Sequence, residues 1–402
     1  MLVHALDDAV LNRQPGVDLN QHALALVLAL GIGIGAIVAF PLLRPGVRAA
    51  VSLVFGILAL VNGGLHVAHI ATVEAAHSDY TGVLAAVAGV ALVVLGLAIP
   101  FRHRGEGAAT RPRRWAYRLV AILAGVLTLY VFLFPVGGAL VQTHKHREAI
   151  GEPPSAAYEP VTFDASDGVR LSGWYVASTN RAAVVLVHGG GGDRTGAVRH
   201  ARLLAGHGYG VLLYDSRGRG ESDGGHNALG WDWDKDVEGA LAFLRERPDL
   251  DPERIGGLGL STGADVLIEV APTHRELKAV VSDGATFRSF EDIRNLSGID
   301  YTAPFYWPFI TAVRVFSGSS PGEPLEDLVA RVSPTPLLLI ASGNAQREAE
   351  VNRLYAAAAR EPVELWEIPD GTHTAALREH PEEYEQRVVG LFDRALLGRR
   401  SS

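Results

Sequence analysis

The sequence contains no cysteine among its 402 residues. This absence excludes disulfide bonds, thiolate metal sites and a cysteine nucleophile, and it suits a chain that works in an oxidising compartment. A basic block is also missing, because 36 lysines and arginines are spread among 44 aspartates and glutamates, for a net charge of −8. Recognition of nucleic acid needs a clustered positive surface, so nucleic acid is not an expected partner.

The first 142 residues differ from the rest because they contain four long apolar runs. These runs lie at about residues 22–43, 49–70, 81–101 and 115–141. Each is long enough to cross roughly 30 Å of hydrocarbon as a helix that rises about 1.5 Å per residue. A buried helix of a soluble protein would show a polar stripe, whereas these runs are apolar all round. We therefore predict an all-α transmembrane domain of four helices over residues 1–142.

The charges around these runs predict an orientation. The first and third loops carry eight arginines, whereas the opposite side has three basic residues, Arg13, Lys145 and Arg147. Because basic loops favour the cytoplasmic side, both termini and the second half of this multi-pass protein are expected outside the cytoplasm. His66 and His69 lie three residues apart on the second run. This spacing fits either a metal or haem site or ordinary hydrogen bonds between helices.

Residues 143–158 are polar and contain two consecutive prolines, which predicts a linker. The chain from 159 to 402 then alternates between short apolar runs and helical segments. We predict eight strands, at 161–165, 169–177, 182–187, 210–214, 255–260, 277–281, 336–340 and 363–368. The predicted helices lie at 197–206, 233–247, 264–271, 348–359 and 381–397. This alternation predicts an α/β fold with a mostly parallel sheet that is covered on both faces.

The segment Gly259–Gly263 reads G-x-S-x-G and lies between the fifth predicted strand and a helix. In this context the serine sits on a sharp turn, with its hydroxyl clear of the sheet and next to a helix N-terminus. The two glycines allow close packing where a side chain would clash. Ser261 is therefore the candidate nucleophile.

A serine nucleophile needs a base and an orienting acid. His373 follows the last strand, from where a loop histidine can reach over the sheet to Ser261, so it is the candidate base. The acid is expected after the seventh strand, where Glu348 is favoured over Glu350 because Glu350 falls on the outer face of the next helix. Asp283, at the end of the sixth strand, is the alternative acid because that strand ends at the same crevice.

An oxyanion that forms during acyl transfer needs two backbone donors. One candidate is the N–H of Thr262, directly after the nucleophile, and the other is the N–H of Gly190 in the loop His188–Gly192. A Walker-type phosphate loop is excluded there, because no Gly-Lys-Ser/Thr follows. In the loop after the fourth strand, Arg217 and Arg219 either bind an anionic substrate or hold the crevice wall through pairs with carboxylates.

Six short motifs, HGGGG, DSRGRGES, GLSTG, SDGA, IASGN and GTHT, occur in this order within residues 158–398. Through this ordered set the chain resembles the alpha/beta-hydrolase superfamily, and within it the dienelactone-hydrolase and serine-aminopeptidase types. The resemblance implies an eight-stranded, mostly parallel sheet and a Ser-His-acid triad. In such proteins the acid is usually an aspartate at the place of Gln346. In a subset of membrane-tethered bacterial relatives a glutamate at the start of the next helix takes that role, which matches Glu348.

The resemblance also implies a small cap between the sixth and seventh strands, at about residues 285–330. This segment is rich in aromatic residues, which fits a satellite core, an acyl-binding lid or a surface that rests on lipid. The expected function is a membrane-anchored serine hydrolase that cleaves an ester or amide of a small molecule or peptide, with the lipid bilayer as its second partner. A peptidase, an acyltransferase, and an inactive receptor or scaffold are the alternatives. No cofactor or metal ion is expected.

Overall fold

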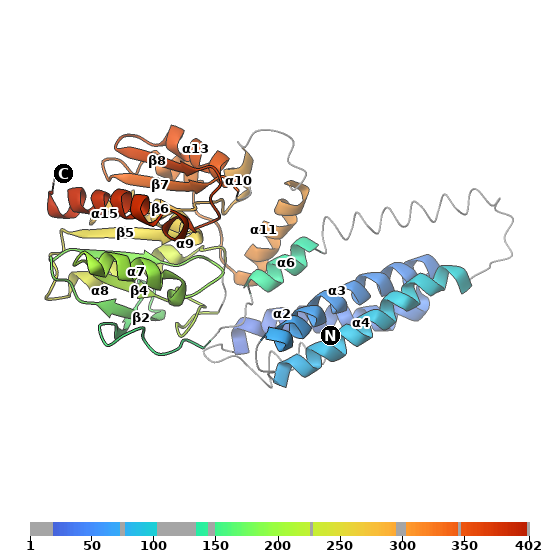
Figure 1. The fold of residues 1–402 in the computed structure, drawn as a ribbon. Helices are drawn as coiled ribbons and strands as arrows, with labels where there is room; N and C mark the ends of the chain where they lie inside the picture. Colours follow the sequence, from blue (N-terminus) through green and yellow to red (C-terminus); the bar gives the residue numbers. More distant parts are fainter. Residues whose placement is uncertain are drawn as a thin grey trace. The chain divides into compact units, whose positions relative to one another are not determined.

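The computed structural model describes residues 19–72, 77–102, 134–143, 149–225, 228–294, 303–344 and 347–399 (Figure 1). The chain divides into two compact units. The first combines Met1–Val141 with Tyr301–Ala312, and the second combines Gln142–Asp300 with Val313–Ser402. The sequence placed residues 301–312 in a cap of the C-terminal domain, whereas the contacts of the folded chain group them with the N-terminal helices.

The described part of the first unit is helical. Its elements are α2 (Leu19–Ala39), η2 (Phe40–Leu42), α3 (Pro45–Thr72), α4 (His77–Arg102) and α6 (Phe134–Thr143). Helices α3 and α4 approach each other closely through glycines. A Cβ atom at Gly56 would lie 2.8 Å from the backbone nitrogen of Val93, and one at Gly89 would lie 2.7 Å from the carbonyl oxygen of Gly56. Such contacts allow the two backbones to touch where larger residues would hold them apart.

No helix in the described part of the chain is long and apolar enough to cross a membrane. The predicted transmembrane domain of four helices therefore has no support in the described helices. Most of the fourth predicted span, residues 115–133, lies outside the described residues, as do the side chains of His66 and His69.

The second unit contains the predicted sheet. Its eight strands are β1 (Glu159–Asp164), β2 (Arg170–Val176), β3 (Ala183–Val187), β4 (Gly210–Tyr214), β5 (Ile255–Leu260), β6 (Leu277–Asp283), β7 (Leu337–Ser342) and β8 (Val363–Ile368). They form one sheet in the order β1-β2-β4-β3-β5-β6-β7-β8. Only the pairs β1–β2 and β2–β4 are antiparallel, and the other pairs are parallel. The prediction of an eight-stranded, mostly parallel sheet is confirmed.

Helices cover both faces of this sheet because its central strands are apolar throughout (Figure 1). One core forms against η4 (Arg194–Ala197), α7 (Val198–Gly206), α14 (Ala376–Glu379) and α15 (Pro381–Leu397). The other forms against α8 (Trp233–Arg245), α9 (Thr262–Val270), α12 (Leu325–Val329) and α13 (Glu348–Ala358). The two cores fix the sheet between them, so its loops start from rigid positions.

The loops that matter for function leave the sheet at one edge. In the parallel registers Val187 pairs with Gly259, Leu260 with Asp283, and Ser342 with Ile368. The residues that follow these strand ends therefore come together, as the ligand-binding crevice of an open α/β sheet requires.

The described part of the predicted cap contains two helices besides α12. They are α10 (Phe290–Arg294) and α11 (Ala303–Ser317). Helix α11 belongs to both units, because its residues up to Ala312 group with the N-terminal helices and the rest with the sheet. Within the first unit, a Cβ atom at Gly138 of α6 would lie 3.7 Å from the ring of Phe309. Phe309, one of the aromatic residues of this segment, thus packs against α6.

Candidate active site

Ser261 occupies a strained turn between β5 and α9. Its backbone has φ 53° and ψ −120°, a region that residues with a side chain rarely adopt. The turn is held in place because the Ser261 N–H donates to the carbonyl oxygen of Asp283 at 2.8 Å, and the Ser261 carbonyl accepts from the Ala264 N–H at 2.8 Å. The strain is local to the residue that the sequence identifies as the candidate nucleophile.

The two glycines of the G-x-S-x-G motif are required by close contacts. A Cβ atom at Gly259 would lie 2.2 Å from the carbonyl oxygen of Gly263. A Cβ atom at Gly263 would lie 2.2 Å from the carbonyl oxygen of Val187, at the end of β3. The first turn of α9 therefore rests directly on the backbone of β3, and this contact sets the position of Ser261 above the sheet.

The structure brings Ser261, His373 and Glu348 into one hydrogen-bonded row. His373 Nε2 lies 2.9 Å from Ser261 Oγ, and His373 Nδ1 lies 2.5 Å from Glu348 Oε2. The three residues come from the end of β5, the loop after β8 and the start of α13. A hydroxyl, an imidazole and a carboxylate in this order are the arrangement that activates a serine for attack.

Neighbouring groups fix the carboxylate and the imidazole loop. The side chain of Glu348 is buried, and its Oε1 accepts the Ser342 N–H at 2.7 Å. Asn352, one turn later on α13, donates through Nδ2 to the carbonyl oxygens of Glu348 and Ala285, both at 2.9 Å. The Ser342 hydroxyl donates to the carbonyl oxygen of Thr372 at 2.9 Å. Ser342, the last residue of β7, therefore contacts both Glu348 and Thr372, the residue that precedes His373.

The hydrogen bond that the His373 imidazole donates to Glu348 raises the pKa of His373 above its ordinary value of about 6.5. Burial works in the opposite direction and is outweighed, because the imidazole is still partly open to solvent. A base whose pKa lies close to the working pH can both accept and return a proton.

Neither of the two alternative acids forms a hydrogen bond with His373 in the described part of the chain. Asp283 is buried, and its side chain interacts with the buried hydroxyl group of Tyr384. Burial raises the pKa of Asp283 to about 7, and the nearby Glu348 adds to this shift. Glu350 forms an ion pair with Arg347 at 3.0 Å. Only Glu348 of the three candidates accepts a hydrogen bond from the imidazole.

The glycine loop after β3 lies against the nucleophile turn. A Cβ atom at Gly189 would be 3.3 Å from Ser261 Cβ and 3.9 Å from Ser261 Oγ. One at Gly190 would be 2.6 Å from Thr262 Oγ1. The absence of side chains here lets the loop backbone approach the serine. The two predicted oxyanion donors, Gly190 and Thr262, are thus neighbours in the folded chain.

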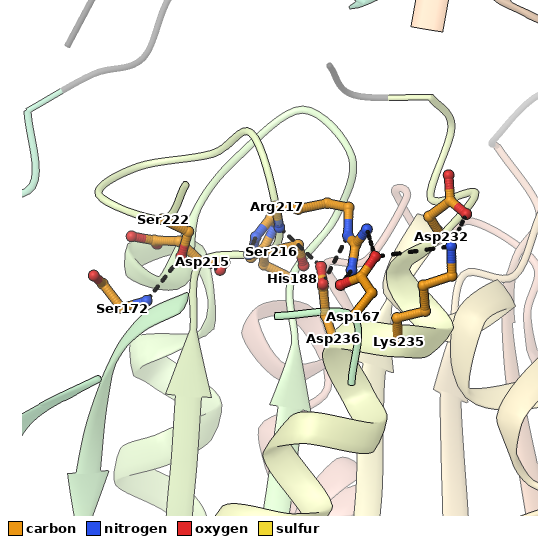
Figure 2. Close-up of polar contacts among 10 residues, drawn as sticks. All are labelled: Asp167, Ser172, His188, Asp215, Ser216, Arg217, Ser222, Asp232, Lys235 and Asp236. Carbon is orange, nitrogen blue, oxygen red and sulfur yellow. Dashed lines mark hydrogen bonds and ion pairs between the residues drawn. The ribbon is translucent and has the colours of Figure 1, made fainter. Parts of the chain in front are cut away.

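The two arginines of the loop after β4 are bound to protein groups, and Figure 2 shows the contacts of Arg217. Arg217 forms a two-point ion pair with Asp167 at 2.8 and 2.9 Å, and its Nε donates to the buried Asp236 at 2.8 Å. Arg219 donates to the carbonyl oxygen of Gly190. Of the two roles that the sequence left open, these contacts favour the structural one.

Two residues of this region were not predicted as functional. Asn352 carries no sequence signal, because an amide on a helix is most often a surface residue. His188 begins the glycine motif directly after a buried strand, and this position is the signal that could have identified it. No group of three histidine, aspartate or glutamate side chains that could hold a metal ion occurs among the described residues.

The chain is similar to several known proteins and to one protein family. A family model described as serine aminopeptidase, S33, matches residues 178–315. YfhR of Escherichia coli K12 is 30% identical over 285 residues, covering 67% of this chain and 93% of that relative. The thiohydrolase aneE of Aspergillus aculeatus is 33% identical over 130 residues, covering 31% of this chain and 41% of that relative. The solved esterase Pf2001 of Pyrococcus furiosus has a TM-score of 0.51 at 24% identity, covering 62% of this chain and 98% of its own.

Because the match to YfhR extends over nearly all of that relative, the chain belongs to the same family, within the alpha/beta-hydrolase superfamily. The likeness to the Pyrococcus furiosus esterase shows the fold. The family and the fold together support the assignment of this chain as a hydrolase.

Proposed function

We propose that the protein is a serine hydrolase that cleaves carboxylic esters of small molecules through Ser261, His373 and Glu348. The observation that carries this proposal is the hydrogen-bonded row of the three side chains, at 2.9 Å and 2.5 Å. The strained backbone of Ser261 adds support, because strain of this kind gathers at active sites.

The geometry suggests a two-stage reaction. Ser261 Oγ attacks the ester carbonyl while its proton passes to His373 Nε2, and Glu348 stabilises the imidazolium that forms. The N–H groups of Thr262 and Gly190 receive the charged oxygen of the tetrahedral intermediate. His373 then gives the proton to the leaving alcohol, and the acyl group stays on Ser261. A water molecule that transfers its proton to His373 releases the acid and restores the serine.

A fluorophosphonate probe is expected to label the wild-type chain and to leave Ser261→Ala unlabelled. The same substitution is expected to lower turnover of a p-nitrophenyl ester about 10⁴- to 10⁶-fold, because it removes the attacking atom. Ser155→Ala, at an exposed serine away from the row, is the control and is expected to label like wild type. Absence of labelling in folded wild-type protein, or equal labelling of Ser261→Ala, contradicts the proposal.

The same assay distinguishes the ester from other acyl substrates. The matched family is described as serine aminopeptidase and one relative as a thiohydrolase, so aminoacyl amides and acyl thioesters are the comparison substrates. All three contain a carbonyl that the same serine can attack. A higher kcat/KM for the amide than for the ester would reassign the protein as a peptidase.

We further propose that the N-terminal unit attaches the protein to the cell membrane, with the sheet domain outside the cytoplasm. Large apolar side chains on α2 and α4 are exposed, among them Ile32 at 62%, Val38 at 66% and Leu84 at 66%. Residues 27–43 and 84–99 contain no charged residue. Exposed apolar side chains that gather on a surface typically contact a lipid or protein partner, and a chain without cysteine suits an oxidising compartment outside the cytoplasm.

The full-length chain is expected to stay in the membrane fraction after washing at high salt and at alkaline pH. A reporter that is active only outside the cytoplasm is expected to be active when fused to the C-terminus. Release of the protein by the washes contradicts attachment through the exposed apolar side chains, and an inactive reporter contradicts the orientation.

A further inference from the structure

His188, the first residue after β3, is buried between the glycine loop and the loop after β4 (Figure 2). The Ser216 N–H donates to its Nε2 at 3.0 Å, and its Nδ1 lies 2.8 Å from the carbonyl oxygen of Gly189. Because Nε2 accepts, the ring proton must be on Nδ1, from where it donates to Gly189. Burial lowers the pKa of His188 to about 4, so the ring is neutral near pH 7.

This hydrogen bond sets the direction of one peptide unit. In a trans peptide the C=O and the following N–H point in opposite directions. The Gly189 carbonyl is held by His188 and by the Gly192 N–H at 3.1 Å, so the Gly190 N–H points away from His188. Arg219 holds the next carbonyl, that of Gly190. The carbonyl groups of Gly189 and Gly190 are therefore both fixed by protein donors.

The loop that carries these donors is itself anchored. Asp215, fully buried at the end of β4, accepts the Arg194 N–H at 2.8 Å and the Glu221 N–H at 2.9 Å. Ser222 donates to the Asp215 carbonyl and accepts the Ser172 N–H at 2.8 Å, a contact that Figure 2 shows. Ser216 and Arg219 lie between these fixed points. Their contacts with His188 and Gly190 therefore start from a rigid support.

We infer that His188 and Arg219 are positioning residues that turn the Gly190 N–H toward the charged oxygen formed on the Ser261 adduct. The inference rests on the proposed function and assigns a task to two residues that do not themselves react. Neither side chain moves a proton in this role. Both residues act through the Gly190 N–H, whose hydrogen bond is strongest once negative charge has formed on the substrate oxygen. They are therefore expected to stabilise the transition state more than the bound substrate.

Two substitutions of His188 separate this role from simple packing. The amide of His188→Asn lies at the same distance along the side chain as Nδ1, so it can still donate to the Gly189 carbonyl. The amide of His188→Gln lies at the distance of Nε2, so it can meet only Ser216. With a p-nitrophenyl ester, kcat of His188→Gln is expected to fall about 10²- to 10³-fold with KM little changed. His188→Asn is expected to recover most of this loss.

Arg219→Met removes the second donor while keeping the length of the side chain, and it is expected to lower kcat with KM unchanged. If the His188 variants do not fold, the kcat of Arg219→Met tests whether the positioning of Gly190 matters for turnover. Folded variants with wild-type kcat, or equal losses in His188→Asn and His188→Gln, would overturn the inference while Ser261 still labels. If wild-type protein neither labels nor hydrolyses the ester, the proposed function itself fails.

Discussion

Glu348→Gln is expected to lower kcat about 10⁴-fold, the size of effect that follows loss of a buried orienting carboxylate. Glu348 Oε2 lies 2.5 Å from His373 Nδ1 and keeps the proton on that nitrogen, which leaves Nε2 to accept from Ser261. A glutamine amide can donate to Nδ1 instead, and the ring then carries its proton on the wrong side. The Ser342 N–H can still bond to the remaining oxygen, so the fold should tolerate the change.

The pH dependence of the same variant provides an independent readout. Glu348 raises the pKa of His373, and only the neutral imidazole can act as the base. Activity is therefore lost as pH falls through a pKa above about 6.5 in the wild type. Without the carboxylate this pKa falls, so the acidic limb of kcat/KM for Glu348→Gln is expected at lower pH. Steady-state rates between pH 4 and pH 9 measure the shift.

Two controls make this test specific. Glu350→Gln makes the same chemical change on the same helix at a carboxylate that pairs with Arg347, and it is expected to keep wild-type turnover. Asp283→Asn alters a buried carboxyl group that interacts with Tyr384 and forms no hydrogen bond with His373 in the described part of the chain, and it is expected to keep most activity. Near-normal turnover of Glu348→Gln together with a large loss in Asp283→Asn would move the acid to Asp283.

The sheet could be predicted from the sequence because its strands are continuous apolar runs. Residues 183–187 and 210–214 are buried at every position, so each run stands out from the helices around it. The candidate nucleophile and base follow from the order of motifs, since Ser261 comes directly after β5 and His373 lies in the loop after β8. Their hydrogen bond joins residues 112 positions apart, and only the strand order of the fold brings them together.

The choice of acid is where the sequence alone leaves alternatives. Asp283 and Glu348 both follow strands that end at the same edge, and the pattern of residues does not say which carboxylate reaches the imidazole. The direction of the side chain decides this, because Glu348 bonds to His373 and to the Ser342 N–H at once. The role of His188 is hidden for a similar reason, since a tautomer depends on two partners in different loops.

The sequence also does not predict that α11 is divided between the two units. Its aromatic residues fit a lid as well as a packing surface, and the pattern alone cannot tell which neighbour they meet. In the folded chain the first part of this helix groups with the N-terminal unit, where Phe309 faces Gly138. A partner that precedes it by some 170 residues, outside the resemblance to the hydrolase superfamily, gives no local signal.

Gly263→Ala is expected to destabilise the protein by about 3 kcal/mol or more, at or above the upper end for overpacking of a buried site. The added methyl group would lie 2.2 Å from the carbonyl oxygen of Val187 and 2.8 Å from that of His188. Both are backbone atoms at the end of a central strand, so neither can move without displacing β3 from its neighbours. Since a typical domain is stable by only about 5–15 kcal/mol, this loss is large.

Urea unfolding of the full-length chain measures this effect, with Gly206→Ala as the matched control. Gly206 ends α7, and a Cβ atom there would have no neighbour within 4 Å, so the same substitution is expected to be neutral or slightly stabilising. The folded fraction of Gly263→Ala should also turn over ester more slowly, because α9 and the glycine loop are pushed apart beside Ser261. Wild-type stability in Gly263→Ala would mean that the first turn of α9 does not rest on β3. The position of the nucleophile would then need another explanation.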